Sequence, residues 1–321
     1  MPPSEKDEPI VPTSSEKPWQ EWVRKKIAFY VSTSKWDNVT ITQLDAWLAN
    51  FNSEGEKYAL ALLNHFIYYS EVDVKRLCLY ALTNVVFRDH LLNADRSSNF
   101  CCRNDMLLSE LKSRIRETRL VPLLSEGNPT ESGNAVARWY TTTGFIPESQ
   151  VIPPDQILPY ISRGACKRFL FVDDLLGSGD QLVRFWNEPS ISIGISGKRS
   201  SLAKIAGQHS AISFEYVALV ATTYGLGVVR RKTPNLKVHF CEQLSDDYRV
   251  FSKNSIFFQK PEEREACSKY INALCRSKNI PARGFQELDF AIAFHHGVPD
   301  SCLPIFWEES DKWTPLFLRR M

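Results

Sequence analysis

The sequence predicts an α/β domain with a parallel sheet and flanking helices, preceded by an α-helical domain. From Trp19 to about Leu92 apolar residues recur at helical spacing, and after Arg119 short uninterrupted apolar runs alternate with helix-like segments. The composition, 43% hydrophobic and 24% charged residues, excludes a fibrous or wholly disordered chain. We therefore expect a flexible tail over 1–17, a helical domain over 18–117, and an α/β domain over 118–321 that ends in a strand-and-loop extension.

Two apolar stripes with capping residues in front of them predict the helical domain. Over residues 44–51 apolar side chains recur at i, i+3, i+4 and i+7. Thr42 and Ser70 each precede such a stripe, with Asp45 and Asp73 three residues further on. A hydroxyl at that position accepts from the third helical amide, and a carboxylate in the first turn faces the positive end of the helix. We expect three or four packed helices, which form either a simple core or a partner-binding module.

Four short apolar runs predict strands that are buried on both faces, as in a parallel sheet. They are Leu120–Leu124, Phe169–Val172, Tyr216–Ala221 and Val238–Cys241. Pro122 favours an edge position for the first run, because proline donates no ladder hydrogen bond. Helix-like stretches follow the other three runs, beginning near Asp180, Thr222 and Ser245. This strand-then-helix repetition is typical of a parallel sheet with crossover helices.

Charge and cysteine usage narrow the class of protein. Lys and Arg number 39 against 37 for Asp and Glu, so any decisive charge must be local. The eight cysteines include no C-x-x-C pair, which argues against a structural zinc site. The N-terminal residues lack the basic-then-apolar order of a signal peptide, so we do not expect a disulfide framework. The most apolar long stretch, Val217–Val229, is too short and too polar to span a bilayer. We expect a soluble protein without a membrane partner, most simply cytoplasmic.

The segment Phe169–Leu182 carries the clearest chemical signal. Two adjacent carboxylates, Asp173 and Asp174, follow a strand, and a small-residue loop leads into the next helix. Glycines let a backbone approach a ligand closely, and loop amides in front of a helix bind anions. The acids would repel a bare phosphate, so we expect them to face sugar hydroxyls or a divalent cation. The predicted phosphate-binding residues are Gly177, Ser178, Gly179, Asp180 and Gln181. The alternative is an ordinary strand-to-helix turn in which Asp180 only caps the helix.

This order of apolar strand, two acids and small-residue loop resembles the ribose-5-phosphate motif of the type I phosphoribosyltransferases. The resemblance implies that Asp173 and Asp174 are the catalytic pair and contact the 2′- and 3′-hydroxyls of phosphoribosyl pyrophosphate (PRPP). It also implies that the loop holds the 5′-phosphate, with Mg²⁺ as cofactor near the two acids, held through the ligand or water. Two positions depart from the motif: Gly177 stands where base-salvage members often carry an acid for the purine, and Gln181 replaces the closing hydroxyl.

The helical block, the loop Gly177–Gln181 and the tail Phe294–Trp307 are together similar to the PRTase-CE family, from about residue 20 onward. That phosphoribosyltransferase-like group is associated with bacterial conflict and anti-phage systems, including some retron loci. The resemblance implies an effector that binds PRPP or a related ribose phosphate and transfers phosphoribose to a base, nucleotide or nucleic acid. One alternative is a non-catalytic nucleotide sensor that binds a reverse transcriptase and its RNA–DNA product. Another alternative is metal-dependent nucleic-acid cleavage by the paired acids. The sequence shows no further acid cluster that would support it.

A second set of residues follows the first predicted strand. It consists of Ser132, Gly133, Asn134 and Arg138. In the phosphoribosyltransferase arrangement an early loop after a strand receives the pyrophosphate, and a guanidinium can bind its oxygens in a bidentate manner. The alternative is a surface loop with a solvated arginine.

The C-terminal extension contains two adjacent histidines, His295 and His296. Strand geometry would point them to opposite faces, so we do not expect them to bind one metal together. Either histidine is a packed or solvated side chain, or one acts as an acid or base near a ligand. The aromatic residues Phe306, Trp307 and Trp313 either pack in a core or stack on a base.

Overall fold

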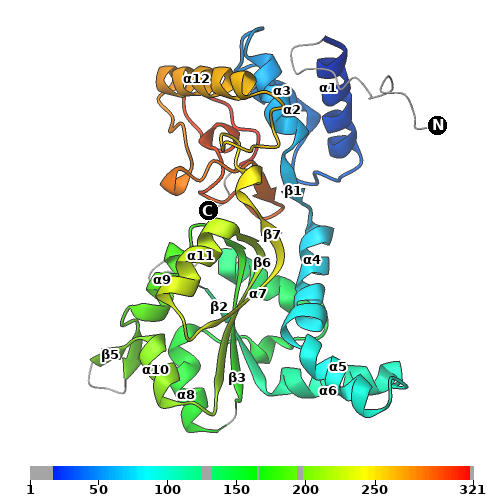
Figure 1. Cartoon of the computed structure of the whole chain (residues 1–321), viewed down its shortest axis with the longest axis vertical. Coiled ribbons are helices and arrows are strands. Elements are labelled where there is room, and N and C mark those ends of the chain that lie inside the picture. Colours follow the sequence, from blue (N-terminus) through cyan, green and yellow to red (C-terminus); the bar gives the residue numbers. More distant parts are fainter. Residues whose placement is uncertain (1–16, 124–131, 165, 194–197, 319–321) are drawn as a thin grey trace, which may run out of the picture. The chain divides into compact units, whose positions relative to one another are not determined.

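The computed structural model describes residues 17–123, 132–164, 166–193 and 198–318 (Figure 1). The tail expected over 1–17 lies outside the described residues except for Lys17, which begins a helix. The chain forms two compact units. Within the described residues, the helical unit comprises 17–68, 247–293 and 302–318, and the sheet unit comprises 69–246 and 294–301.

The helical unit is built from α1 (Lys17–Ser32), α2 (Ile41–Leu48), α3 (Glu56–Asn64) and α12 (Pro261–Lys278), with short 3₁₀ turns at Phe285–Glu287 and Pro304–Phe306. Its core is aromatic. Trp47 is fully buried and stacks on Phe306 with ring centroids 5.4 Å apart, and its Nε1 donates to the Ile305 carbonyl at 2.7 Å. Trp313 is also buried and donates to the same carbonyl. The aromatic residues Phe306 and Trp313 of the C-terminal extension therefore pack in a core.

Two helix starts show how well capping was predicted. Ser70 caps α4 (Glu71–Tyr80) and forms a reciprocal pair of hydrogen bonds with Asp73, as expected. The cap expected at Thr42 is wrong, because α2 begins earlier. Thr40 is its N-cap: its hydroxyl accepts from the Gln43 amide at 3.1 Å, and the Gln43 side chain accepts from the Thr40 amide at 2.9 Å. A glutamine three residues after the threonine completes this box as well as an acid does.

The sheet unit contains the predicted parallel sheet. Its strands are β2 (Thr118–Pro122), β3 (Arg168–Leu176), β6 (Ser213–Thr222) and β7 (Lys237–Leu244). They lie in the order β2-β3-β6-β7, and each neighbouring pair is parallel. Pro122 lies in the edge strand β2, as its missing donor predicts. The inner strands β3 and β6 are buried along almost their whole length, which explains their uninterrupted apolar runs.

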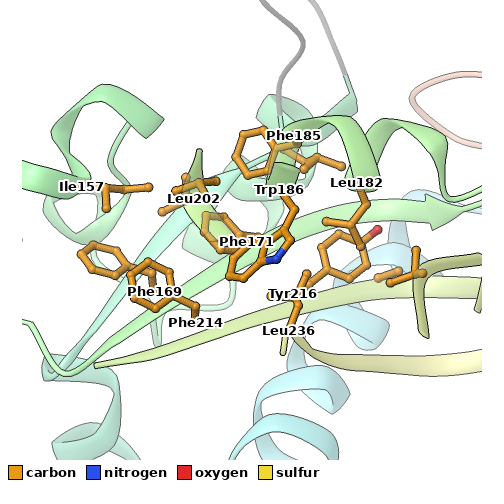
Figure 2. Packing of buried hydrophobic residues seen from close by; sticks show 14 of the residues in the cluster. Ile157, Phe169, Phe171, Leu182, Phe185, Trp186, Leu202, Phe214, Tyr216 and Leu236 are labelled. Carbon is orange, nitrogen blue, oxygen red and sulfur yellow. The ribbon is translucent and has the colours of Figure 1, made fainter. Parts of the chain in front are cut away.

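Helices cover both faces of this sheet in Figure 1. One face packs against α8 (Ile157–Ser162), α9 (Asp180–Asn187), α10 (Leu202–Gln208) and α11 (Thr223–Lys232), beside the antiparallel pair β4 (Ile191–Ile193) and β5 (Lys198–Ser200). Figure 2 shows Phe171 and Tyr216 of the sheet packed near Leu182 and Trp186 of α9. The apolar face of α9 thus follows helical spacing along the chain.

Two of the three helix starts predicted after strands are confirmed. α9 begins at Asp180, and Thr222 caps α11. After Ser245 the chain forms only a 3₁₀ turn at Asp246–Tyr248. A helix cannot continue there, because the amide of Val250 donates to the carbonyl of Asp289 at 2.8 Å.

The first boundary between the two compact units lies between residues 68 and 69, whereas the sequence predicts one between 117 and 118. The helices α4, α5 (Arg88–Ser97) and α6 (Asn104–Arg116) and the π-helical turn Ala81–Val86 belong to the sheet unit. There α4 packs against α7 (Ser132–Thr142), and α6 packs against β2. β1 (Ile67–Tyr69) and β8 (Ile292–Phe294) form a separate two-stranded sheet at the residues where the chain changes units.

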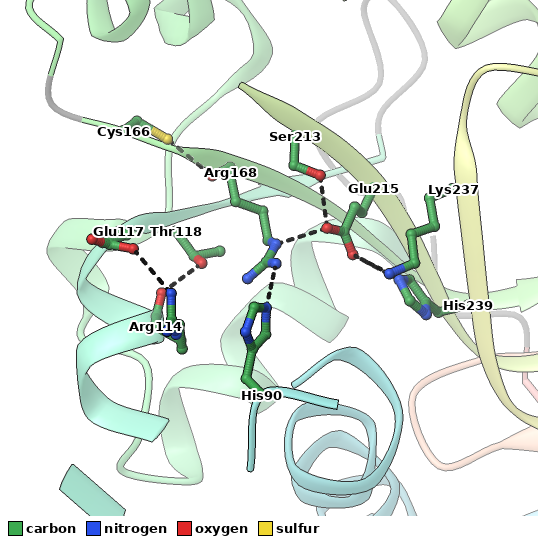
Figure 3. Close-up of polar contacts among 10 residues, drawn as sticks. All are labelled: His90, Arg114, Glu117, Thr118, Cys166, Arg168, Ser213, Glu215, Lys237 and His239. Atoms are coloured by element: carbon green, nitrogen blue, oxygen red, sulfur yellow. Dashed lines mark hydrogen bonds and ion pairs between the residues drawn. The ribbon is translucent and has the colours of Figure 1, made fainter. Parts of the chain in front are cut away.

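A buried ion-pair cluster lies near the amino ends of β3, β6 and β7 (Figure 3). Glu215, with 2% of its side chain exposed, accepts from Arg168 at 2.8 Å and from His239 at 2.7 Å. Arg168 also contacts His90 of α5 at 3.3 Å. Burial alone would raise the pKa of Glu215, but the His239 hydrogen bond and the Arg168 charge lower it to about 2. The cluster ties the start of the sheet to α5.

Two further expectations concern membrane spans and disulfides. None of the described helices combines the length and apolar character that crossing a bilayer requires. All eight cysteines lie among the described residues, and none of them forms a disulfide bond there.

Candidate functional site

Asp173 and Asp174 lie at the carboxyl end of β3, where ligands of parallel sheets bind. Neighbouring residues of a strand point to opposite faces, so the two carboxylates have different surroundings. Asp173 is 3% exposed and accepts from the Tyr216 hydroxyl at 3.4 Å and from the Asp174 amide at 3.0 Å. Burial, together with the charges of Asp173 and Asp174, raises the pKa of Tyr216. Tyr216 therefore keeps its proton and acts as a donor to Asp173.

Asp174 is paired with His296, which lies 122 residues further along the chain. The imidazole Nε2 is 2.8 Å from Asp174 Oδ2, and each side chain is 11% exposed. Asp174 Oδ1 accepts from the Leu175 amide at 2.7 Å. Burial alone would raise the pKa of Asp174, but the hydrogen bond and charge of His296 outweigh it, so this pKa lies below its ordinary value. Asp174 is thus a buried, ionised carboxylate, and Nε2 donates to it.

The segment 294–301 that carries His296 is fixed to the sheet unit. Phe294 and Gly297 exchange backbone hydrogen bonds of 2.9 and 3.1 Å, which close a tight turn around the two histidines. The His295 amide donates to the Tyr69 carbonyl at 2.7 Å, and the Tyr69 and Phe294 rings stack 5.0 Å apart. The Tyr69 hydroxyl donates to Glu242 of β7 at 2.6 Å. These contacts hold the turn in place.

The glycine loop after β3 packs closely on the first turn of α11. A Cβ atom on Gly225 would lie 2.3 Å from the Gly177 carbonyl oxygen, so only glycine fits there without a shift. Thr222 Oγ1 donates to that same carbonyl at 2.6 Å while it accepts from the Gly225 amide at 2.9 Å. Gly179 has φ of 82°, a conformation that favours glycine, and is the N-cap of α9. The loop conformation is therefore set by β6 and α11.

This packing decides where the loop amides point. The carbonyls of Leu176 and Gly177 face Gly225, and in a trans peptide the following N–H points the opposite way. The amides of Gly177 and Ser178 therefore point away from α11. Within the part of the chain that the structure describes, neither amide, nor that of Gly179, donates to a protein acceptor. Residues 177 and 178 are half-buried. Open amides before a helix N-terminus suit an anion.

The rest of the predicted loop belongs to this arrangement. Ser178 Oγ accepts from the Asp180 amide at 3.3 Å, which leaves its proton available for a ligand. Asp180 and Gln181 form the first turn of α9 and are half-buried. The structure thus brings all five predicted phosphate-binding residues to one strand end, beside the Asp pair.

Three of the residues predicted to bind pyrophosphate, Ser132, Gly133 and Asn134, lie in the first turn of α7, and Arg138 lies further along that helix. A Cβ atom on Gly133 would lie 2.2 Å from the Leu123 carbonyl oxygen, so the helix start packs against the end of β2. The Leu123 amide donates to Val172, the residue before Asp173. Gly133, and with it the backbone of Ser132 and Asn134, therefore reaches the same sheet edge as the acids, although the Ser132 side chain is outside the description. Arg138 is exposed, and its role stays a prediction.

The side chains at this strand end also bear on whether Mg²⁺ could bind there. Among the described residues, no three His, Cys, Asp or Glu side chains form a group that could hold a metal ion. Asp173 and Asp174 supply carboxylate oxygens at the strand end. Mg²⁺ commonly takes one or two carboxylates and completes its shell with substrate phosphates and water. These residues therefore fit an ion that arrives with a phosphorylated ligand.

The fold and this strand-end site define a phosphoribosyltransferase-like α/β protein. A family model for PRTase-CE matches residues 44–319, and the chain belongs to that family. A comparison with curated proteins gives no match.

The pairing of His296 with Asp174 could not be located from the sequence. The interpretation of His296 as a packed residue and its interpretation as a residue near a ligand were both open, and the structure places it against a site carboxylate. The tail pattern around it was the available signal.

Proposed function

We propose that the sheet unit binds PRPP, or a related ribose phosphate, as its Mg²⁺ complex and transfers phosphoribose to an acceptor. One observation carries the proposal: open loop amides at Gly177 and Ser178 lie at the end of the strand that bears the ionised Asp174. The loop would take the 5′-phosphate, and Asp173 and Asp174 would take the ribose hydroxyls. The first turn of α7 would face the pyrophosphate.

Transfer at such a site would rest on positioning and charge. The acceptor's lone pair forms the new bond to C1′, the bond from C1′ to the pyrophosphate oxygen breaks, and pyrophosphate leaves with that electron pair. Mg²⁺ bound to the phosphates would supply positive charge for the leaving group. Asp173 and Asp174 hold the ribose while its ring gains positive charge, which their negative charge favours. The acceptor is a base, a nucleotide or a nucleic acid.

We further propose that this activity serves as an effector in bacterial anti-phage defence, with a retron reverse transcriptase and its RNA–DNA product as partner. Membership of the PRTase-CE family supports this role. Phage challenge of cells that carry the wild type or the Asp173→Asn variant tests it. Equal protection by both would contradict a role for the site in defence.

Calorimetric titration with PRPP and Mg²⁺ tests the binding itself. Asp173→Asn and Asp174→Asn should each weaken binding about 10- to 100-fold, because a hydrogen bond to a charged group is lost at constant shape. Asp105→Asn, at a 63% exposed side chain of α6, is the matched control and should bind as the wild type does. Absence of wild-type binding, or equal binding by all four proteins, would overturn the proposal.

A second function is favoured by the surroundings of Gly177. A Cβ atom there would lie 3.3 Å from Ser301 Oγ, so the position leaves little room for the acid that base-salvage members often carry. A site without that acid fits a nucleotide sensor that binds its ligand and leaves it intact. An assay of pyrophosphate release across bases, nucleotides and nucleic acids separates the two functions. Release with any acceptor supports the transferase, whereas binding without release supports the sensor.

A further inference from the structure

His296 and Ser301, in the segment 294–301, each carry a buried polar atom that no protein group satisfies. His296 Nδ1 and Ser301 Oγ are inaccessible to solvent and make no hydrogen bond within the described residues. Ser301 as a whole is 2% exposed. Buried polar atoms are nearly always hydrogen-bonded, so these two exceptions at His296 and Ser301 require a reason.

Both atoms lie at the candidate site. The ring of His296 is held by Asp174, since its Nε2 donates to that carboxylate at 2.8 Å. Ser301 Oγ lies beside the loop, 3.3 Å from the point where a Cβ atom on Gly177 would be. The backbone bonds between Phe294 and Gly297 and the stacking on Tyr69 hold the segment at the sheet unit. Because neither atom is open to water without a ligand, a ligand contacts them only if the glycine loop or the side chains beside it shift as it binds.

The chemistry of the two atoms matches a sugar phosphate. Because Nε2 donates to Asp174, Nδ1 accepts in the neutral ring and donates in the charged one, and a hydroxyl group can meet it in either state. Ser301 Oγ can donate to a phosphate oxygen held on the neighbouring loop amides. Two groups that already lack water lose no solvation when a ligand pairs with them.

We infer that the segment 294–301 forms a wall of the ribose-phosphate site, where His296 Nδ1 bonds a ribose hydroxyl and Ser301 Oγ bonds the phosphate on the glycine loop. This inference rests on the proposed function and assigns to it two ligand contacts outside the Asp-Asp loop. In this arrangement His296 binds ligand and also positions Asp174.

Two conservative variants of the full chain test it by calorimetry with ribose 5-phosphate and with PRPP and Mg²⁺. Ser301→Ala removes the hydroxyl, and His296→Gln keeps a donor for Asp174 while it removes Nδ1. Each should raise Kd about 5- to 10-fold, the effect of one hydrogen bond. Ser200→Ala is the control: Ser200 is 4% exposed and its Oγ is also unpaired, but it belongs to the separate β4–β5 pair and not to the parallel sheet that carries the site.

Thermal unfolding without ligand separates a binding role from a structural one. Removal of an unpaired buried hydroxyl costs the apo protein nothing, so Ser301→Ala should melt at or above the wild-type temperature while it binds more weakly. A lower melting temperature with unchanged Kd would make Ser301 structural and overturn its assignment.

Deoxygenated sugars test the His296 contact. With 2-deoxyribose 5-phosphate and 3-deoxyribose 5-phosphate, the penalty of His296→Gln should vanish for the sugar that lacks the contacted hydroxyl and persist for the other. An equal penalty for both sugars would overturn the contact. If the wild type binds and both variants bind equally well, the inference fails and the proposed function stands. If the wild type binds neither ligand, the proposed function itself fails.

Discussion

The contact between Gly225 and the glycine loop makes a strong prediction about two glycines of one helix. A Cβ atom on Gly225 would lie 2.3 Å from the Gly177 carbonyl oxygen and 2.9 Å from that of Leu176. Carbon–oxygen contacts are normally about 3.3 Å or longer, so the loop and α11 must separate by about 1 Å. Such overpacking costs about 1–3 kcal/mol, against a gain of about 0.5–1 kcal/mol from replacing a helical glycine. Gly225→Ala should therefore lower the free energy of unfolding by about 1–2 kcal/mol.

Gly227→Ala is the matched control in the same helix. The nearest atom to its Cβ would be the Arg231 guanidinium at 3.5 Å, an ordinary contact. This variant should be about 0.5–1 kcal/mol more stable than the wild type. Thermal unfolding measures both, with about 2–4 °C expected for each kcal/mol. Calorimetry with PRPP should show weaker binding only for Gly225→Ala, because only that loop moves. If Gly225→Ala is as stable as Gly227→Ala, the loop does not pack on α11 as described.

Two further predictions concern the ion-pair cluster and the aromatic core. Because the pKa of Glu215 is lowered in the fold, its carboxylate stabilises the fold fully above about pH 4.5 and loses this effect as the pH falls toward 2. The unfolding free energies of wild type and Glu215→Gln should therefore differ by about 3 kcal/mol at pH 7, and by less than half of that at pH 3. Urea unfolding at each pH measures the difference. A gap that does not change with pH would contradict the ion pairing. Trp47→Ala should cost about 3–5 kcal/mol in unfolding free energy, whereas Trp22→Ala, at a 54% exposed position, should change it by no more than about 0.5 kcal/mol. Equal losses for the two would show that Trp47 is not part of a packed core.

The sheet could be predicted from the sequence because its signals are local. Parallel strands such as β3 and β6 are buried on both faces, so each reads as an unbroken apolar run. The Asp pair and the glycine loop follow directly after one such run, and the end of a parallel strand is where a ligand binds. The Ser70 cap could be predicted for the same reason, since its partner Asp73 is three residues away.

Features that depend on distant segments could not be predicted. His296 and Asp174 are 122 residues apart in the chain, and the sequence around one gives no sign of its contact with the other. The need for glycine at 225 arises from a carbonyl of the preceding strand-to-helix loop, which spacing alone does not reveal. The helical unit likewise joins residues 17–68 to residues 247–293, because apolar faces far apart in the chain pack together. Local periodicity gives the elements but not these pairings.

The chain passes between its two units several times, which limits how the site can be studied in a shortened protein. Residues 294–301 lie in the sheet unit, yet the stretches before and after them, 247–293 and 302–318, belong to the helical unit. A fragment that stops at residue 246 would keep the whole parallel sheet and both aspartates but lose the imidazole. Asp174 would then lose the hydrogen bond and the charge of His296, the two largest of the contributions that lower its pKa. An inactive fragment of that kind would say nothing about the intact protein.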